Sequence, residues 1–254
     1  VYAGRDEKHG KEVAIKILRG DLKKELRSAE RFRREALVIS RLDHPNIIAI
    51  RGFGEFDRRK FYLVMEYVEG VSLHYTISSD APFGVRRVLS IAAQIADALA
   101  HAHENRVLHR DLKPGNILLS HERNAPDVVK VLDFGLAKIS RPGKNDTLTR
   151  AGLVLGTPEY MAPEQACGQR LDGRCDVYAC GAILYEMLVG VPPFKGKGVF
   201  DTLRQQVIAA PPAPRDVRDD VIIPSLVERI VLKCLEKRPE NRFSSAKQLA
   251  RVLR

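Results

Sequence analysis

Short apolar runs and one helical repeat dominate the first part of the chain, and they predict a small sheet with a single helix. Four runs have the length and composition of β-strands: residues 1–6, 11–18, 47–54 and 60–68. Between the second and third runs, residues 21–42 carry apolar side chains every three or four positions, which is the period of an amphipathic helix. Pro45 follows, and we expect the helix to end before it because proline has no backbone N–H to continue the ladder.

After Gly70 the pattern changes to long helical segments. The segments with a helical period are residues 85–105, 174–189, 199–209, 225–235 and 244–253. We therefore expect an α+β fold with two lobes: a small β-rich N-lobe (1–65) with one helix, and a larger helical C-lobe (71–254). Residues 66–70 would be the hinge, and a cleft between two rigid bodies is a preferred place for a small ligand.

Two later runs carry the side chains with the clearest chemistry. Residues 107–119 read VLHRDLKPGNILL, and residues 131–138 read VLDFGLAK. Each begins as an apolar strand and breaks into a loop that bears carboxylate or amide oxygens, so we expect Asp111, Asn116 and Asp133 to lie around one point. Hard oxygen ligands of this kind suit Mg²⁺ and phosphate.

Lys16 and Glu35 form a second candidate pair. Lys16 lies in the strand VAIKIL on a face that otherwise carries Ala14 and Leu18, where a lysine needs an anion. Glu35 lies within the apolar stripe of the predicted helix, and a buried carboxylate without a partner costs several kcal/mol. We expect the two side chains to form an ion pair. The alternative for Lys16 is a surface position from which its ammonium reaches water.

The motifs HRDLKPGN, DFG and APE (162–164) follow one another in the order and spacing found in eukaryotic-type protein kinases, and the resemblance covers essentially the whole chain. Lys113 and the run GTPEYMAPE resemble the serine/threonine branch, in which Thr157 would face the catalytic aspartate. The runs YMAPEQ and DGRCDVYACG are most similar to bacterial members. The resemblance implies ATP-dependent phosphorylation of serine and threonine hydroxyls on protein substrates, with Mg²⁺ as the metal.

The same resemblance implies a role for each candidate residue. Asp111 would accept the proton of the substrate hydroxyl, and Lys113 would offset the charge of the transferred phosphate. Asn116 and Asp133 would hold the metal ion, and the predicted lysine–glutamate pair would position the α and β phosphates of ATP. The implied catalytic residues are therefore Asp111, Lys113, Lys16 and Glu35.

Two further positions match structural residues of the family. Asp176 matches a helix aspartate that braces the catalytic loop. Arg242 matches an arginine that pairs with Glu164. Neither is expected to touch the substrate.

The nucleotide pocket implied by the resemblance draws on both lobes and the hinge. Its expected residues are Val1, Ala14, Lys16, Met65, the backbone from Glu66 to Val68, Asn116, Leu118 and Asp133. One part of the family pattern is missing: the glycine-rich loop GxGxxGxV, of which Val1 would be the final valine, would lie upstream of the first residue. Gly52 and Gly54 do not replace it, because they follow the strand lysine and Asp57 stands where the third glycine would be.

Residues 136–156 form a polar loop that is longer than compact domains normally contain, and it resembles an activation segment. We expect autophosphorylation at Thr147 and Thr149, through self-association of two copies, with Arg110, Lys138 and Arg31 as the basic partners of the phosphate. The alternative is a mobile polar loop without this role.

Composition narrows the expected partners and location of the chain. The net charge is +10, but Lys and Arg are scattered with no aromatic-interleaved stripe, so we expect no nucleic-acid partner. Four cysteines without metal-type spacing indicate a reducing compartment. No apolar run approaches the roughly 20 residues that span a bilayer. We expect a cytoplasmic domain without membrane contact of its own, and any anchor would lie outside the fragment.

Two alternatives from other classes remain. A pseudokinase, which is a nucleotide-binding scaffold on the same fold, is disfavoured because every residue implied for catalysis is present, whereas a scaffold is free to lose any of them. A nucleic-acid-binding module rests on net charge alone.

Overall fold

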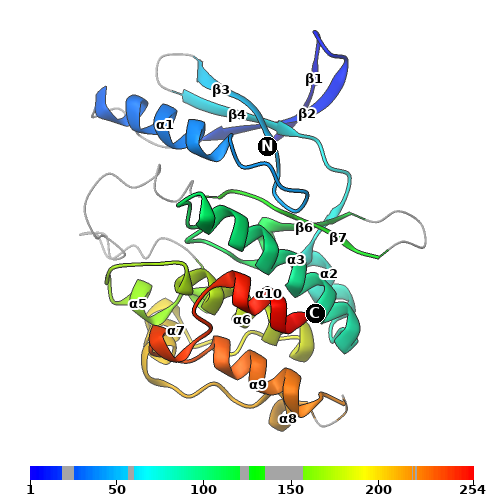
Figure 1. The fold of residues 1–254 in the computed structure, drawn as a ribbon, viewed down its shortest axis with the longest axis vertical. Helices are drawn as coiled ribbons and strands as arrows, with labels where there is room; N and C mark the ends of the chain where they lie inside the picture. The colour runs from blue at the N-terminus through cyan, green and yellow to red at the C-terminus, as the bar shows by residue number, and fades with distance from the viewer. Residues whose placement is uncertain (19–25, 57–59, 121–125, 135–156, 219, 221) are drawn as a thin grey trace.

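A computed structural model describes residues 1–18, 26–56, 60–120, 126–134, 157–218, 220 and 222–254 (Figure 1). The elements of the smaller, upper part are β1 (Tyr2–Asp6), β2 (Lys11–Leu18), α1 (Leu26–Ile39), β3 (Ile50–Phe56) and β4 (Lys60–Glu66). The elements that follow are β5 (Val71–Ser72), α2 (Leu73–Asp80), α3 (Val85–Glu104), η2 (Pro114–Asn116), β6 (Ile117–Ser120), β7 (Val128–Val131), η3 (Pro158–Tyr160), α5 (Pro163–Ala166), α6 (Arg174–Val189), α7 (Val199–Ile208), α8 (Pro214–Val217), α9 (Ser225–Cys234), η4 (Pro239–Asn241) and α10 (Ala246–Leu253).

The upper part is an antiparallel sheet in the order β1-β2-β4-β3 with α1 lying against it (Figure 1). Phe32 of α1 is fully buried, and its ring centroid lies 4.5 Å from that of Phe61 and 6.1 Å from that of Phe53. Across the sheet, Lys16 of β2 lies opposite Leu63 of β4. The aromatic contacts fix α1, the helix that carries Glu35, on the sheet at β3 and β4.

A second sheet, in the order β5-β6-β7, connects the two parts of the molecule. Ile47, which precedes β3, forms a parallel bridge with Val131 at the end of β7. The backbone N–H of Ile48 donates to the carbonyl of Val131 at 3.0 Å, and the N–H of Val131 donates to the carbonyl of Asn46 at 2.8 Å. The segment leading into the upper sheet is therefore bonded directly to the strand that leads into Asp133.

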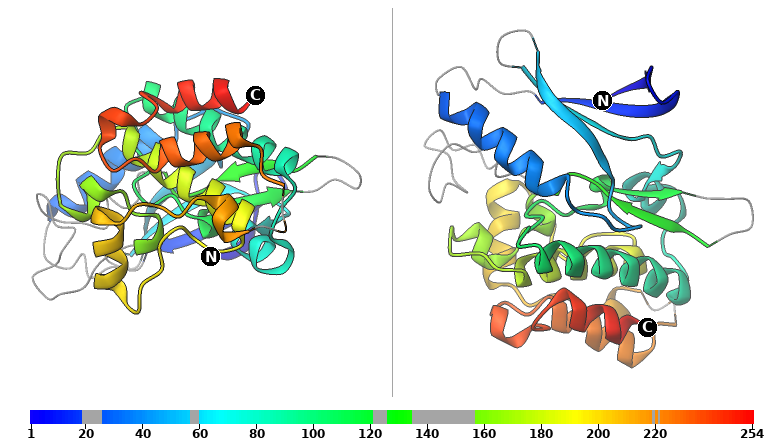
Figure 2. Two further views of the ribbon diagram at one scale, coloured as in Figure 1. Left: turned by 90° about the horizontal axis from the view of Figure 1, so that it is seen from below. Right: turned by 45° about the horizontal axis from the view of Figure 1, so that its top comes forward.

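The lower part is built around α6, which is buried along almost its whole length. A helix that is apolar on every side must lie inside a protein, and α3 and α9 pack on it (Figure 2). At Gly181 the contact with α9 is so close that a Cβ atom would come within 2.3 Å of the Cβ of Cys234. The helix ends at Gly190, whose φ of 88° is in the left-handed region that glycine adopts readily.

The structure confirms the α+β class and the arrangement of a small β-rich lobe above a larger helical one (Figure 1). It corrects the strand expected at the start of residues 107–119, because β6 begins only after Asn116. The backbone donors that a strand would use are taken elsewhere: Val107 N–H donates to the Ala102 carbonyl, and the next loop amides donate to Asp176. The short helix α2 was not predicted, because Thr, Ile and Ser in LHYTISSD weaken the helical pattern.

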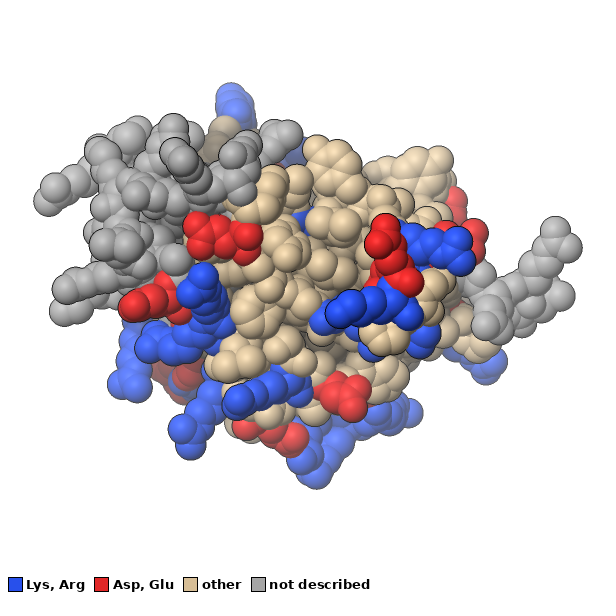
Figure 3. Space-filling model, turned by 90° about the horizontal axis from the view of Figure 1, so that it is seen from above, with Lys and Arg blue, Asp and Glu red and all other residues tan. Residues whose placement is uncertain are grey.

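Basic and acidic side chains are interspersed on the upper face of the molecule (Figure 3). Opposite charges on one face screen each other, which agrees with the scattered distribution seen in the sequence. Among the described helices, none has the length and apolar character that crossing a bilayer requires.

Candidate active site

The carboxylate of Asp176, in the first turn of α6, holds the loop that carries Asp111. Asp176 is 1% exposed and accepts hydrogen bonds from the backbone N–H groups of His109 and Arg110, both at 2.9 Å, and lies 2.8 Å from Nε2 of His103. Burial acts to raise the pKa of Asp176, but the hydrogen bond and charge of His103, together with the hydrogen bond from the Arg110 N–H, lower it below its ordinary value. The predicted bracing role is confirmed.

Low pH should weaken the hydrogen bonds that the carboxylate of Asp176 accepts from the loop. A carboxyl group whose pKa is lowered by folding contributes stability above its ordinary pKa of about 3.9, and the contribution is lost as pH falls through the folded-state pKa. We expect the loss of unfolding free energy in Asp176→Asn to be largest near about pH 7. It should shrink as pH falls from about 4 through the folded-state pKa, below which the wild-type carboxyl is also neutral. Urea unfolding of both proteins over a pH series measures the difference. A difference that stays constant down to about pH 2 would contradict the assignment.

The imidazole of His109 links the loop of Asp111 to the loop of Asp133. The ring is buried; its Nδ1 accepts a hydrogen bond from the N–H of Asp111 at 3.3 Å, and its Nε2 lies 2.8 Å from the carbonyl of Leu132. Burial lowers the pKa of His109, so the ring is neutral, and these partners place its proton on Nε2. The His109 ring also contacts Phe134, with centroids 4.8 Å apart. Both loops are thus held to one rigid side chain.

Arg110 and Asp133 have left-handed backbones, with φ of 67° and 63°. Such conformations cost a non-glycine residue about 1–3 kcal/mol and persist where the surroundings determine them. Both residues belong to the predicted motifs. Two of the three described non-glycine residues with positive φ therefore lie in these loops, one directly before Asp111 and one at Asp133; the third is Arg106.

Asp111, Lys113 and Thr157 meet at one place. Nζ of Lys113 donates to Oγ1 of Thr157 at 3.0 Å and lies 3.1 Å from Oδ2 of Asp111. Lys113 and Asp111 are partly exposed, at 28% and 33% of their side-chain surface, so a substrate can reach them. A carboxylate beside a hydroxyl can accept its proton, and an ammonium beside both can offset developing negative charge.

Asn116 and Asp133 present oxygen atoms near the same loop. Nδ2 of Asn116 donates to the carbonyl of Asp111 at 2.8 Å, which leaves its Oδ1 for another partner, and the N–H of Leu132 donates to the carbonyl of Asn116 at 2.8 Å. Within the described residues, no group of three or more His, Cys, Asp or Glu side chains is placed to hold a metal. A metal held by one amide and one carboxylate oxygen would complete its shell with phosphate and water oxygens, as Mg²⁺ commonly does.

Lys16 reaches from β2 and forms an ion pair with Oδ2 of Asp133. The structure thus brings Lys16 to the predicted metal-binding carboxylate, across the space between the upper sheet and the loop of Asp133. Glu35 lies on α1 with a half-buried side chain. The ion pair between Lys16 and Glu35 stays a prediction.

The residues expected around the nucleotide base are distributed over both parts. Ala14 of β2 lies opposite Met65 of β4, and Met65 is buried. Val68 is partly buried against the core, Leu118 lies in the middle of β6, and Val1 is 79% exposed. The sheet pairing brings Ala14 and Met65 together; the contribution of all five to nucleotide binding stays a prediction.

Glu66 contributes to the fold through its side chain as well as its backbone. Its Oε1 accepts hydrogen bonds from the N–H of Ala49 at 2.9 Å and from Nζ of Lys130 at 2.7 Å. Since Lys130 belongs to β7, this ion pair joins the end of β4 to the second sheet.

Arg242 and Glu164 form a buried ion pair, as the sequence predicts. The guanidinium donates to both carboxylate oxygens of Glu164, at 2.7 and 2.8 Å, and also to the carbonyls of Arg174, Glu236 and Lys237. These bonds tie α5 to α6 and to the segment after α9.

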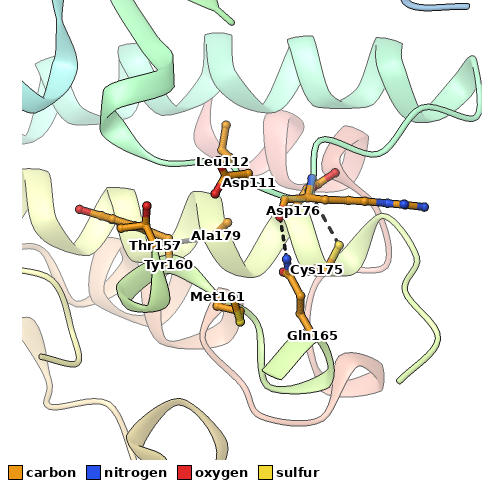
Figure 4. A pocket seen from close by; sticks show the side chains of 10 residues that line it. Asp111, Leu112, Thr157, Tyr160, Met161, Gln165, Cys175, Asp176 and Ala179 are labelled. Atoms are coloured by element: carbon orange, nitrogen blue, oxygen red, sulfur yellow. Dashed lines mark hydrogen bonds between the residues drawn. The ribbon is translucent and has the colours of Figure 1, made fainter. Parts of the chain in front are cut away.

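A pocket lies beside Asp111, and sequence reasoning missed one of the residues around it (Figure 4). Its lining consists of Arg110, Asp111, Leu112, Thr157, Tyr160, Met161, Gln165, Cys175, Asp176 and Ala179. The missed residue is Gln165, whose Nε2 donates to the carbonyl of Arg110 at 2.6 Å. The only sequence signal was its place directly after the APE motif. His109 and His103 were also missed, because bonds to backbone groups and to a distant aspartate leave no pattern in the sequence.

Four of the predicted residues lie outside what the structure describes. Thr147, Thr149 and Lys138 fall in the undescribed range 135–156, and the side chain of Arg31 is likewise not described. Their roles stay predictions.

Comparison with known proteins agrees with this geometry. The family model described as "Protein kinase domain" matches residues 1–252. The chain is 44% identical over 247 residues to serine/threonine-protein kinase pkn3 of Myxococcus xanthus, which covers 97% of this chain and 45% of that protein. It is 41% identical over 249 residues to serine/threonine-protein kinase PrkC of Bacillus subtilis, covering 98% of this chain and 37% of that protein.

A third relative is serine/threonine-protein kinase PknB of Mycobacterium tuberculosis, which is 38% identical over 252 residues, with 98% of this chain and 39% of that protein covered. The chain therefore spans less than half the length of the curated relatives it matches.

Proposed function

The chain belongs to the protein kinase domain family, and from this premise we propose that it transfers the γ-phosphoryl group of ATP to serine or threonine hydroxyls of protein substrates. The observation that carries the proposal is the position of Lys113, whose Nζ contacts both Asp111 and Thr157. A substrate hydroxyl at this point lies beside a base for its proton and a cation for the charge of the phosphate. The relatives described above are all serine/threonine-protein kinases by name, which supports this choice of acceptor.

Two of the side chains act on the acceptor hydroxyl and the transferred phosphate, and the others bind the nucleotide and its metal ion. Asp111 takes the hydroxyl proton as the new P–O bond forms and the bond from the γ-phosphorus to the leaving ADP breaks. Lys113 stabilises the charge on the transferred group. Lys16 holds phosphate oxygens from the side of the upper sheet, with Glu35 as its proposed partner. Asn116 and Asp133 would hold Mg²⁺, which neutralises phosphate charge when bound.

Phosphoryl transfer from radiolabelled ATP tests the proposal. Three peptides that differ only in a Ser, Thr or Tyr acceptor are offered to the protein together with Mg²⁺. We expect label on the Ser and Thr peptides and none on the Tyr peptide. Nucleotide binding without transfer to any peptide would overturn the proposal in favour of a nucleotide-binding scaffold.

Asp133→Asn should weaken Mg²⁺-ATP binding rather than the chemical step alone. Charged hydrogen bonds and ion pairs of this kind are worth roughly 1.5–3 kcal/mol, so we expect the Kd to rise about 10- to 100-fold. Calorimetric titration with and without Mg²⁺ measures the effect. Asp97→Asn is the matched control, because Asp97 pairs with Arg254 between α3 and α10, away from the site. Equal affinities for Mg²⁺-ATP in the two variants would show that Asp133 does not hold the metal ion.

We further propose a division into an N-lobe (1–65), a hinge (66–70) and a C-lobe (71–254), since the upper sheet ends at Glu66 and α2 starts at Leu73. Thr147 and Thr149 are the proposed autophosphorylation sites, reached by self-association of two copies. The four cysteines are free thiols, which supports a reducing, cytoplasmic location for this domain. Scattered rather than clustered basic residues support protein substrates over nucleic acid.

A further inference from the structure

We infer that Gln165 is a positioning residue for catalysis: its side-chain amide holds the peptide unit that carries Asp111. The inference rests on the proposed role of Asp111 as the base. It adds a residue that lies outside the motifs from which that role was assigned.

The contact is short, and it joins the buried Gln165 to the half-buried Arg110. Nε2 of Gln165 donates to the carbonyl oxygen of Arg110 at 2.6 Å, and the Gln165 residue is 6% exposed. Figure 4 shows the side chain of Gln165 pointing from α5 toward the loop of Asp111, with a dashed line at this bond. A hydrogen bond partly shielded from water holds its partner more firmly than one on the surface.

The bond acts on the peptide plane that orients Asp111. The carbonyl of Arg110 and the N–H of Asp111 belong to one planar unit. Gln165 donates to the carbonyl end of this unit, and Nδ1 of His109 accepts from the N–H end at 3.3 Å. Gln165 and His109 thus form hydrogen bonds to opposite ends of this peptide plane.

The conformation of Arg110 explains why this peptide needs hydrogen bonds to hold it. Its φ of 67° lies in the left-handed region, which an arginine leaves readily unless its neighbours prevent it. The N–H of Arg110 is held by Asp176 and its carbonyl by Gln165. With the carbonyl released, rotation of the following peptide would carry the Asp111 carboxylate away from Lys113.

Gln165 is itself held in place by its neighbour in the chain. Glu164 forms the buried ion pair with Arg242, and the N–H of Gln165 donates to the carbonyl of Ala162 at 3.0 Å. The four-residue helix α5 therefore has one side chain anchored in the lower core and the next directed at the catalytic loop. A positioning group needs this kind of second support.

Two substitutions separate positioning from packing. Gln165→Met keeps the volume and removes the donor, whereas Gln165→Glu keeps the shape and replaces the donor with an acceptor. We expect kcat to fall about tenfold in Gln165→Met, which equals about 1.4 kcal/mol of transition-state free energy, and further in Gln165→Glu. The KM for ATP should stay within about twofold, because Lys16, Asn116 and Asp133 do not contact Gln165.

Gln94→Met is the matched control. Gln94 is a half-buried glutamine whose amide donates to the carbonyl of Asp127 at 2.9 Å, between α3 and β7, and it makes no contact with the loop of Asp111. We expect it to lower the unfolding midpoint while kcat per folded molecule is kept.

The pH profile of Gln165→Glu gives a readout that a packing role would not move. A carboxyl buried against a carbonyl titrates above its ordinary pKa of about 4.3, and once protonated it can donate an O–H to Arg110. The ratio of kcat in Gln165→Glu to kcat in wild type should therefore rise as pH falls from about 8 to about 6, while the Gln165→Met ratio stays flat.

Wild-type kcat in Gln165→Met, or an equal fall in Gln94→Met, would overturn the inference, and so would a flat ratio for Gln165→Glu. Failure of the proposed function would look different, because wild-type protein would then transfer no phosphate to any acceptor.

Discussion

Asp111→Asn is expected to lower kcat for phosphoryl transfer about 10³-fold while the affinity for Mg²⁺-ATP stays within about twofold of wild type. The carboxylate of Asp111 lies 3.1 Å from Nζ of Lys113, at the place where the acceptor hydroxyl would lose its proton. An asparagine cannot take that proton, and general bases typically contribute about 10²–10⁴-fold to rate. The nucleotide is held by other residues, so its binding should be untouched.

Single-turnover transfer from radiolabelled ATP and calorimetric nucleotide titration together test this expectation. The substitution preserves shape, and the backbone carbonyl of Asp111 that accepts from Asn116 remains, so the loop keeps its internal bonds. Lys113→Met is an informative companion, because loss of the cation should also lower kcat with the base still present. Wild-type turnover in Asp111→Asn would show that another group takes the proton.

Arg242→Met is expected to lower the unfolding free energy by about 3–5 kcal/mol. The side chains of Arg242 and Glu164 are 0% and 6% exposed, and the guanidinium also donates to three backbone carbonyls. Removing the cation leaves a carboxylate buried without its partner, which is among the most destabilising single changes known in proteins. Denaturant unfolding followed by circular dichroism measures the loss.

The double variant Arg242→Met with Glu164→Met should be more stable than Arg242→Met alone, because no unpaired charge is then left in the core. Lys247→Met removes the exposed ion pair with Glu104 and should leave the unfolding midpoint unchanged. A double variant no more stable than the single one would show that the carbonyl contacts of Arg242, and not its ion pair, hold α5.

The hydrophobic pattern predicted the long helices and missed a short one. Residues 174–189 were predicted as a helix with the bounds that α6 has, because an apolar run of this length that stops at a glycine has few other solutions. The helix over residues 73–80 buries only Leu73, Thr76 and Ile77, and a cap also secures it, with Oγ of Ser72 accepting from the N–H of Tyr75 at 3.2 Å. Leu73 and Ile77 are too few apolar positions for a helical period to be recognised in the sequence.

The sequence likewise predicted some features of the site and missed others. Motif spacing predicted that Asp111, Asn116 and Asp133 lie around one point. Hydrogen bonds join Asn116 to the carbonyl of Asp111 and to the N–H of Leu132, the residue before Asp133. The predicted partner of Lys16 was Glu35. The structure shows an ion pair of Lys16 with Asp133, and the pair with Glu35 stays a prediction. A sequence motif fixes the type and order of residues. Which of them form an ion pair depends on differences of a few ångströms that the motif does not contain. Contacts to backbone carbonyls, such as that of Gln165, are invisible to pattern altogether.

The bonds from Asp176 to the amides of His109 and Arg110 place the catalytic loop in the same cooperative unit as α6. Loops normally open by local fluctuations that cost far less than global unfolding. This one opens only when bonds inside the core break, so its geometry persists for as long as the helical part stays folded. Heating would then abolish activity in one step with the loss of the core, and not by a gradual drift of the loop.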